Sequence, residues 1–366
     1  TEANCLRSAI LPSNGHKPSA PSIPEPDQPR LSKEITMNNV TRRHVLKGAS
    51  AIAALAATAG PAPSSFAAAS RQSFQAPGFY RTSVGELEVT ALLDGTLPLP
   101  LPEMYRSIPQ EDAKRILQEA FREIPTDTSV NAFLINDGER LVLIDAGTGA
   151  YLGPEAGHLL KNLEASGYKA SQVDHVILTH IHTDHSGGLI SDGKVVFEKA
   201  TLHVPQRDLD FWIKTPAGAR PQGVTEQLFI EAEECLRPYL QRDKVVYFKD
   251  NQQVIPGFNS ILRTGHTPGH SSIVVESGGR KIVFWGDITH GDIVQFDQPG
   301  VTIEFDVDHP SAVASRQAAF AEAVREGYLV AGAHIAFPGI GNVLQDGITF
   351  RWMPVNYSDG EGGLIR

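Results

Sequence analysis

Residues 176–188 read VILTHIHTDHSGG, a short apolar strand that runs directly into a turn rich in metal-binding side chains. His180, His182, Asp184 and His185 all lie in this one turn. Neutral imidazoles and carboxylates bind zinc and similar cations, and a loop after a buried strand can aim several of them at one point. Without a cation, their burial would leave several polar groups in need of partners. We therefore predict a metal site at this turn.

Strand-like and helix-like patterns alternate around the turn. Alternating apolar residues predict strands, and a 3.6-residue apolar period predicts amphipathic helices. We expect strands within 86–95, 129–138 and 139–147, helices within 110–124 and 157–168, and short apolar strands that stop at a polar residue at 175–180, 244–248 and 281–287. The order indicates one α/β domain with two mixed sheets facing each other and helices outside.

Three later segments carry further ligand-type side chains. Residues 265–270 read GHTPGH, residues 284–287 read FWGD, and residues 333–334 read Ala-His. Taken singly, His270, Asp287 or His334 is weak evidence, because a lone His or Asp at a strand end is more often a hydrogen-bonded structural residue. Their order behind the first turn strengthens all three.

The pattern His-x-His-x-Asp-His after an apolar strand resembles the metallo-β-lactamase superfamily, and the later segments supply its remaining ligands in the expected order. The resemblance implies an αββα sandwich, in which two mixed β-sheets are flanked by helices. It also implies two metal ions and assigns their ligands: His180, His182 and His270 to one ion, Asp184, His185 and His334 to the other, and Asp287 as the bridge. His266 is expected to bond a ligand or the backbone, and Asp145 to orient the histidine turn.

Two cations that share an anion can hold and acidify one bridging water, so that hydroxide is available near neutral pH. The expected reaction is attack of this hydroxide on a carbonyl or phosphoryl centre, with Asp184 passing a proton to the leaving group and Asp287 as the second catalytic residue. Zn²⁺ is the expected metal for a histidine-rich site, and manganese, cobalt and iron tolerate similar ligands.

A closer resemblance joins residues 76–358 to methyl parathion hydrolases and their lactonase and arylesterase relatives, through segments such as HIAFPGIG at 334–341 and WMPVNYS at 352–358. It implies an apolar pocket, whose candidate residues are Tyr151, Leu152, Phe211, Trp212 and Phe229. The alternative for these aromatics is core packing. Tyr151 and Leu152 stand where parathion hydrolases carry a pocket Phe, which argues against efficient organophosphate turnover.

The expected function is hydrolysis of lactones or aryl esters, with phosphotriesters as a promiscuous side reaction. One alternative is a dedicated organophosphate hydrolase of the methyl parathion type. Others are a β-lactamase, which the lack of a Cys near Asp287 disfavours, and a non-hydrolytic metal-binding relative, which the intact His182 disfavours. The formal net charge of -10 argues against nucleic acid as a partner and is compatible with a small uncharged substrate. Relatives suggest a homodimer.

The N-terminal part reads differently from the rest of the 366 residues. Residues 1–36 are rich in Pro and Ser and are interpreted as disordered or upstream sequence, and residues 37–69 resemble a cleavable twin-arginine signal with Arg42-Arg43. Its apolar run is too short for a stable membrane anchor. We expect the hydrolase domain to cover 70–366 and to be exported to the periplasm or secreted. Cys235 is expected to be a buried thiol.

Overall fold

The computed structural model describes residues 71–358, and two seven-stranded sheets form its frame. The first sheet contains, in spatial order, β1 (Phe79–Val84), β2 (Leu87–Leu99), β4 (Thr126–Asn136), β5 (Leu141–Ile144), β6 (His175–Ile177), β9 (Thr201–Pro205) and β10 (Val245–Phe248). The second contains β11 (Gln253–Ile255), β12 (Phe258–Leu262), β13 (Ser271–Ser277), β14 (Arg280–His290), β16 (Leu329–His334), β17 (Ile340–Asp346) and β18 (Thr349–Pro354). Both sheets mix parallel and antiparallel pairs.

Alternation along the strands divides the apolar residues between two cores. In β14, Phe284 packs into the core between the sheets, whereas its neighbour Trp285 packs into the core beneath a helix. In β5, Ile144 faces the other sheet and Leu143 faces the opposite side. Successive side chains of a strand point to opposite faces, so strands that are apolar throughout require cover on both.

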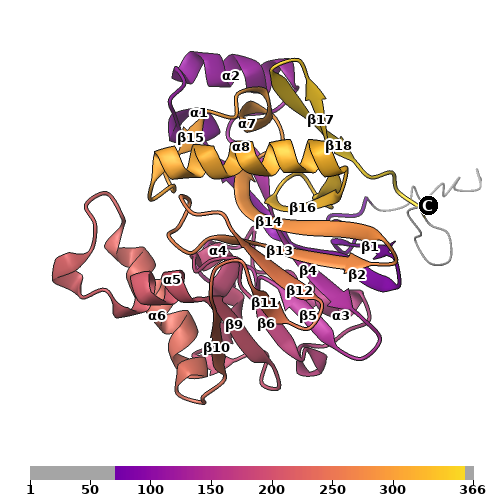
Figure 1. The fold of residues 1–366 in the computed structure, drawn as a ribbon, viewed down its shortest axis with the longest axis vertical. Helices are drawn as coiled ribbons and strands as arrows, with labels where there is room; N and C mark the ends of the chain where they lie inside the picture. The colour runs from indigo at the N-terminus through magenta and orange to yellow at the C-terminus, as the bar shows by residue number, and fades with distance from the viewer. Residues whose placement is uncertain (1–70, 359–366) are drawn as a thin grey trace, which may run out of the picture. The chain divides into compact units, whose positions relative to one another are not determined.

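Helices supply that cover (Figure 1). α3 (Leu159–Ala165) and α6 (Glu226–Leu240) pack on the outer face of the first sheet. α8 (His309–Glu326) packs on the outer face of the second sheet, where Phe320 stacks on Trp285. The layers therefore run helix, sheet, sheet, helix, and the fold prediction is confirmed.

Shorter elements complete the described chain. They are the α-helices α1 (Leu101–Met104), α2 (Gln110–Glu119), α4 (Thr183–Ser186), α5 (Gln206–Asp208) and α7 (Val294–Asp297), the 3₁₀ helices η1 (Ala170–Gln172), η2 (Gly187–Leu189) and η4 (Ala217–Ala219), and the π-helix η3 (Leu209–Ile213). Two strand pairs are separate from the large sheets: β3 (Tyr105–Arg106) with β15 (Thr302–Ile303), and β7 (Ile190–Ser191) with β8 (Lys194–Val195).

The predicted strands and helices are present, but several boundaries differ: β2 continues to Leu99, α2 ends at Glu119, and β6 ends at Ile177. The difference at β14 matters most for the site. The sequence pattern ended the strand of residues 281–287 at its polar residue, but β14 continues through Asp287 to His290. It continues because β16 runs parallel beside it and pairs as far as His290 opposite His334. Asp287 therefore belongs to a strand rather than to a loop, which limits its freedom to move.

The signal sequence predicted at 37–69 and the segment 1–36 lie outside the described residues. Within residues 71–358, none of the helices combines the length and apolar character needed to cross a lipid bilayer. Cys235 is a free, buried thiol on α6, as expected.

Candidate metal centre

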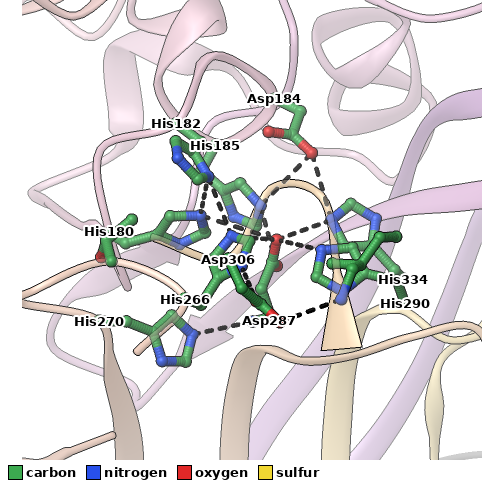
Figure 2. A network of polar contacts seen from close by, with 12 residues as sticks. His180, His182, Asp184, His185, His266, His270, Asp287, His290, Asp306 and His334 are labelled. Carbon is green, nitrogen blue, oxygen red and sulfur yellow. Dashed lines mark hydrogen bonds and ion pairs between the residues drawn. The ribbon is translucent and has the colours of Figure 1, made fainter. Parts of the chain in front are cut away.

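Two groups of ligand-type side chains meet at one end of the sandwich (Figure 2). The first group contains His180, His182, His266 and Asp287, and the second contains Asp184, His185, Asp287 and His334. In each group the ligand atoms all lie within 4.8 Å of one another. Asp287 is common to both groups, as a carboxylate that bridges two cations must be.

The ends of neighbouring strands bring these residues together. β6 ends just before His180, and the short helix α4 that follows carries Asp184 and His185 in a single turn. β14 and β16 run parallel, so Asp287 and His334 emerge at the same end of the second sheet. The residue before Asp287 is Gly286 with φ +59°, and a Cβ there would lie 2.6 Å from the His270 ring. Only glycine therefore fits directly before the shared carboxylate.

The carboxylate of Asp287 lies at the centre of the cluster. Its Oδ1 lies 3.0 Å from His185 Nε2, and its Oδ2 lies 3.2 Å from His334 Nε2. His185 Nε2 and Asp287 Oδ1 are both buried and have no hydrogen-bond partner among the described residues. Two polar atoms so close without a hydrogen bond suit a shared cation between them. Imidazole nitrogens and carboxylate oxygens are the donor set that divalent cations such as zinc accept.

Buried acceptors orient three of the histidines. His185 donates from Nδ1 to Asp145 over 2.8 Å, and His266 donates from Nδ1 to Asp306 over 2.9 Å. His334 donates from Nδ1 to the carbonyl of Ser129 over 2.9 Å. Each bond holds the proton on Nδ1 and leaves Nε2 free to bind a cation. Asp145 thus has the orienting role expected of it, whereas Asp306 was not recognised in the sequence.

The structure exchanges the roles expected for His266 and His270. His270 lies outside both ligand groups: its Nε2 accepts from the backbone N–H of Asp287 over 2.9 Å, and its Nδ1 lies 3.1 Å from the carbonyl of Arg263. The His266 ring instead reaches the centre, with Nε2 3.1 Å from Asp287 Oδ2. The assignment of His270 as a ligand is therefore wrong, because backbone groups occupy both of its nitrogens. Its role is to hold the backbone of the shared aspartate.

His290, three residues after Asp287, also lies beside the ligand groups. Its ring is buried, lies 3.2 Å from Asp287 Oδ2 and stacks on His334. Its position follows from the unexpected length of β14, which carries it level with His334. It lines the cavity in front of the ligand groups.

Asp208, which no sequence pattern indicates, connects the two histidine loops through hydrogen bonds. Its buried carboxylate accepts hydrogen bonds from the backbone N–H of Ile181, the hydroxyl of Thr267 and the backbone N–H of Gly269. Burial raises the pKa of Asp208 to about 6, although these donors lower it. No ligand-like spacing marks this residue in the sequence, since it lies in the unremarkable segment that follows β9.

The carboxylates and imidazoles of the cluster shift one another's pKa values. Burial lowers the pKa of every histidine here, but Asp287 and Asp184 outweigh burial at His334 and raise its pKa to about 10. Asp287 and Asp306 likewise raise the pKa of His266 to about 9. Burial raises the pKa of Asp287, yet the surrounding imidazoles hold it well below its usual range. The acids thus attract positive charge into a buried site, and cations that bind there must displace protons.

A cavity of about 340 Å³ opens onto both ligand groups. Its apolar walls are Leu97, Pro98, Leu99, Leu152, Leu228 and Phe305. A neighbouring cavity of about 430 Å³ shares His182, Leu228 and Phe305 with it and is more polar, with Arg106 and Glu304 on its wall. The side chain of Asp184 is 19% exposed and that of Asp287 2%, so of these two acidic ligands Asp184 is the more accessible to a bound molecule.

Of the five residues predicted for the pocket, Leu152 alone lines the cavity that holds the ligand groups. Trp212 lines the neighbouring cavity and lies edge-on to His182, with ring centroids 5.2 Å apart. Phe229 is fully buried in the core under α6, Phe211 packs against that core, and Tyr151 lines a separate cavity and bonds Glu234. For Phe211 and Phe229 the core alternative is the correct one.

The sequence model of the metallo-beta-lactamase superfamily matches residues 125–334, more than half of the chain. The chain belongs to this superfamily. Superfamily membership and the two ligand groups together suggest dinuclear metal binding in a hydrolase fold.

Two solved structures resemble this chain over most of its length. One is described as hydrolase AbOPH in the beta lactamase superfamily, with 37% identity, a TM-score of 0.73 and coverage of 78% of this chain and all of that one. The other is AidC, a dizinc quorum-quenching lactonase, with 28% identity, a TM-score of 0.71 and coverage of 77% and 99%.

Curated relatives match shorter stretches. The human acyl-coenzyme A thioesterase MBLAC2 is 30% identical over 189 residues, which is 48% of this chain and 62% of that protein. The N-acyl homoserine lactonase of Bacillus cereus is 24% identical over 125 residues, which is 34% of this chain and 41% of the lactonase. The chain thus spans less than two thirds of these relatives, and their activities support a proposal rather than an assignment.

Proposed function

We propose that the protein hydrolyses small, uncharged carboxylic esters, with lactones and aryl esters as the preferred substrates. The observation that carries the proposal is the cavity of about 340 Å³ whose apolar walls open directly onto both ligand groups. Apolar walls around a few polar groups suit an uncharged organic substrate. The likeness to a dizinc lactonase, at 28% identity over 77% of the chain, supports the lactone part of the proposal.

The chain's own residues divide the work between the two ligand groups. His180, His182 and His266 would hold one cation, and Asp184, His185 and His334 the other, with Asp287 shared. Two divalent cations in these positions would supply an activated water as nucleophile and would polarise the carbonyl oxygen of the substrate. Asp287 belongs to β14, and its backbone is bonded by His270, so the carboxylate that both groups share has a fixed position. Asp184 lines the cavity, and we propose that it passes a proton to the leaving oxygen.

Zn²⁺ is the metal that we propose, because five of the seven donors are imidazoles. We also propose that the chain belongs to the same subgroup as the methyl parathion hydrolases, because its segments at 334–341 and 352–358 resemble theirs. Phosphotriesters would then be secondary substrates. We also retain, as proposals, export through a twin-arginine signal at 37–69 and a homodimeric state.

The test is a substrate panel measured with protein of known metal content. The panel contains dihydrocoumarin, an N-acyl homoserine lactone, 4-nitrophenyl acetate, methyl parathion and a short acyl thioester. The expected result is about two metals per chain, the highest kcat/KM for a lactone or aryl ester, and loss of activity with a chelator that is reversed by Zn²⁺. A higher kcat/KM for methyl parathion would favour the dedicated organophosphate hydrolase, and one for the thioester would favour a thioesterase.

A further inference from the structure

One acid in the cavity belongs to neither ligand group. Glu231 on α6 lines the cavity together with the apolar walls and the ligands Asp184 and Asp287. The two metal-ligand groups found within residues 71–358 do not include it. The mechanism above therefore leaves a carboxylate unused beside the reacting centre.

Its known contacts do not use all of its hydrogen-bonding capacity. One carboxylate oxygen accepts from the hydroxyl of Thr183, and the other accepts from Gln227 Nε2 over 3.0 Å. A carboxylate offers about four acceptor positions, so further donors can bind. Among residues 71–358 no ion pair neutralises Glu231, whereas Glu226 and Glu233 of the same helix pair with Arg220 and Arg237.

The surroundings make this charge effective. Glu231 is partly buried, and Leu228 one helical turn before it and Leu152 line the same cavity. A substrate that fills the cavity displaces water from these walls, and electrostatic interactions strengthen in the less polar space that results. A hydrogen bond to a charged acceptor is then stronger than one to a neutral acceptor. A second anion in the same space would be repelled.

We propose that Glu231 is a specificity-determining residue that selects substrates with an N–H donor next to the scissile ester, such as an acylamino substituent on a lactone ring. The carboxylate accepts the hydrogen bond of that N–H group while the ester faces the two ligand groups. Substrates with an anionic group in the same position are disfavoured. This inference rests on the proposed esterase function and adds to it the substrate feature that the cavity recognises.

A purely structural role makes a different prediction. Thr183 lies between His182 and Asp184, so the Glu231–Thr183 bond also holds the first histidine turn. Loss of that bond would slow every substrate by the same factor, because the turn carries ligands of both groups. Loss of substrate recognition would slow only substrates that carry the donor.

The experiment compares the kcat/KM of lactone-ring opening, identified from the products, for two matched lactones: N-hexanoyl homoserine lactone and the analogue in which an ester oxygen replaces the amide N–H. We expect Glu231→Gln to lower the ratio of kcat/KM for the amide lactone over the ester lactone by about tenfold. Glu233→Gln removes the same charge from an exposed position on α6 and is expected to leave the ratio unchanged. Thr183→Val, which removes only the hydroxyl contact, is expected to lower both rates together.

Three results would overturn the inference. If the ratio in Glu231→Gln stays within about twofold of the wild-type ratio while the wild type hydrolyses both lactones, Glu231 does not read the N–H group and the esterase function stands. If both rates fall by one factor together with metal content, Glu231 only positions the turn. If the metal-loaded wild type hydrolyses neither lactone, the inference is wrong, because no acylamino lactone is then selected; if it fails on 4-nitrophenyl acetate as well, the proposed function is wrong too.

Discussion

The strand β6 separates two histidine clusters of opposite character. At the start of the strand, a ring nitrogen of His175 lies 3.0 Å from a ring nitrogen of His203 on β9. Burial lowers the pKa of both histidines, that of His203 to about 4. Beyond its end lies the metal centre, where the rings are buried more completely than His175, but carboxylates raise the pKa of His266 and His334. Imidazoles alone therefore form a neutral pair, and it is the shared acid that creates a site for cations.

Removing that acid is expected to have the largest effect. Asp287→Ala takes away the one donor common to both ligand groups and leaves the imidazoles without an anion between them. We expect kcat/KM for the best lactone to fall by about a thousandfold or more, with loss of bound metal. Metal analysis and kinetics on the same sample measure both. Asp297→Ala, an exposed aspartate in α7, is the control, and unchanged activity in Asp287→Ala would remove it from the mechanism.

The next largest effects are expected at the two histidines of the loop at 265–270, whose substitutions should have different consequences. His266→Ala removes a donor from the first group, and we expect loss of about one metal per chain and about a hundredfold of activity. His270→Ala removes contacts to the backbone of Asp287 and Arg263, and we expect retained metal with a stability loss of about 1–3 kcal/mol. Thermal unfolding and metal content distinguish them. The reverse pattern would restore His270 as the ligand.

Substitution of Asp208 should have a smaller effect, which is limited to the affinity for metal. In Asp208→Asn, the amide NH₂ group replaces one carboxylate oxygen and faces a backbone N–H of Ile181 or Gly269, from which it cannot accept a hydrogen bond. The two histidine loops should therefore move slightly apart. We expect metal affinity to fall by about tenfold, as for other residues that orient ligands. Competition with a chelator measures the affinity. Asp210→Asn, an exposed residue two positions later, provides the comparison, and equal affinities in the two variants would contradict the role given to Asp208.

Much of this centre could be predicted from sequence because His180 to His185 lie in one continuous turn, where spacing alone decides which side chains meet. The loop at 265–270 carries two histidines four residues apart, and only their contacts in the folded chain show that His266 reaches the Asp287 carboxylate while His270 bonds the Asp287 backbone. Pocket walls such as Leu97 and Phe305 come from segments more than two hundred residues apart, and no local pattern joins them.

The smallest effect on metal binding and catalysis is expected at the neutral pair, which should affect stability alone. The pKa of His203 is about 4 in the folded chain and about 6.5 when unfolded, so between these values the unfolded chain binds more protons. Stability should therefore be fully present above pH 6.5 and fall by up to about 3 kcal/mol as the pH decreases to about 4. His203→Phe should flatten this part of the pH profile, measured by denaturant unfolding, whereas His158→Gln at an exposed position should not. Parallel profiles in all three proteins would refute the assignment.

Anomalous diffraction from crystals of the Zn²⁺-loaded protein tests most directly whether one carboxylate unites the two ligand groups. The account predicts two peaks about 3.5–4 Å apart, both in contact with Asp287, with His266 Nε2 bound to the first and His334 Nε2 to the second. A single peak, or a first ion bound by His270 in place of His266, would contradict it.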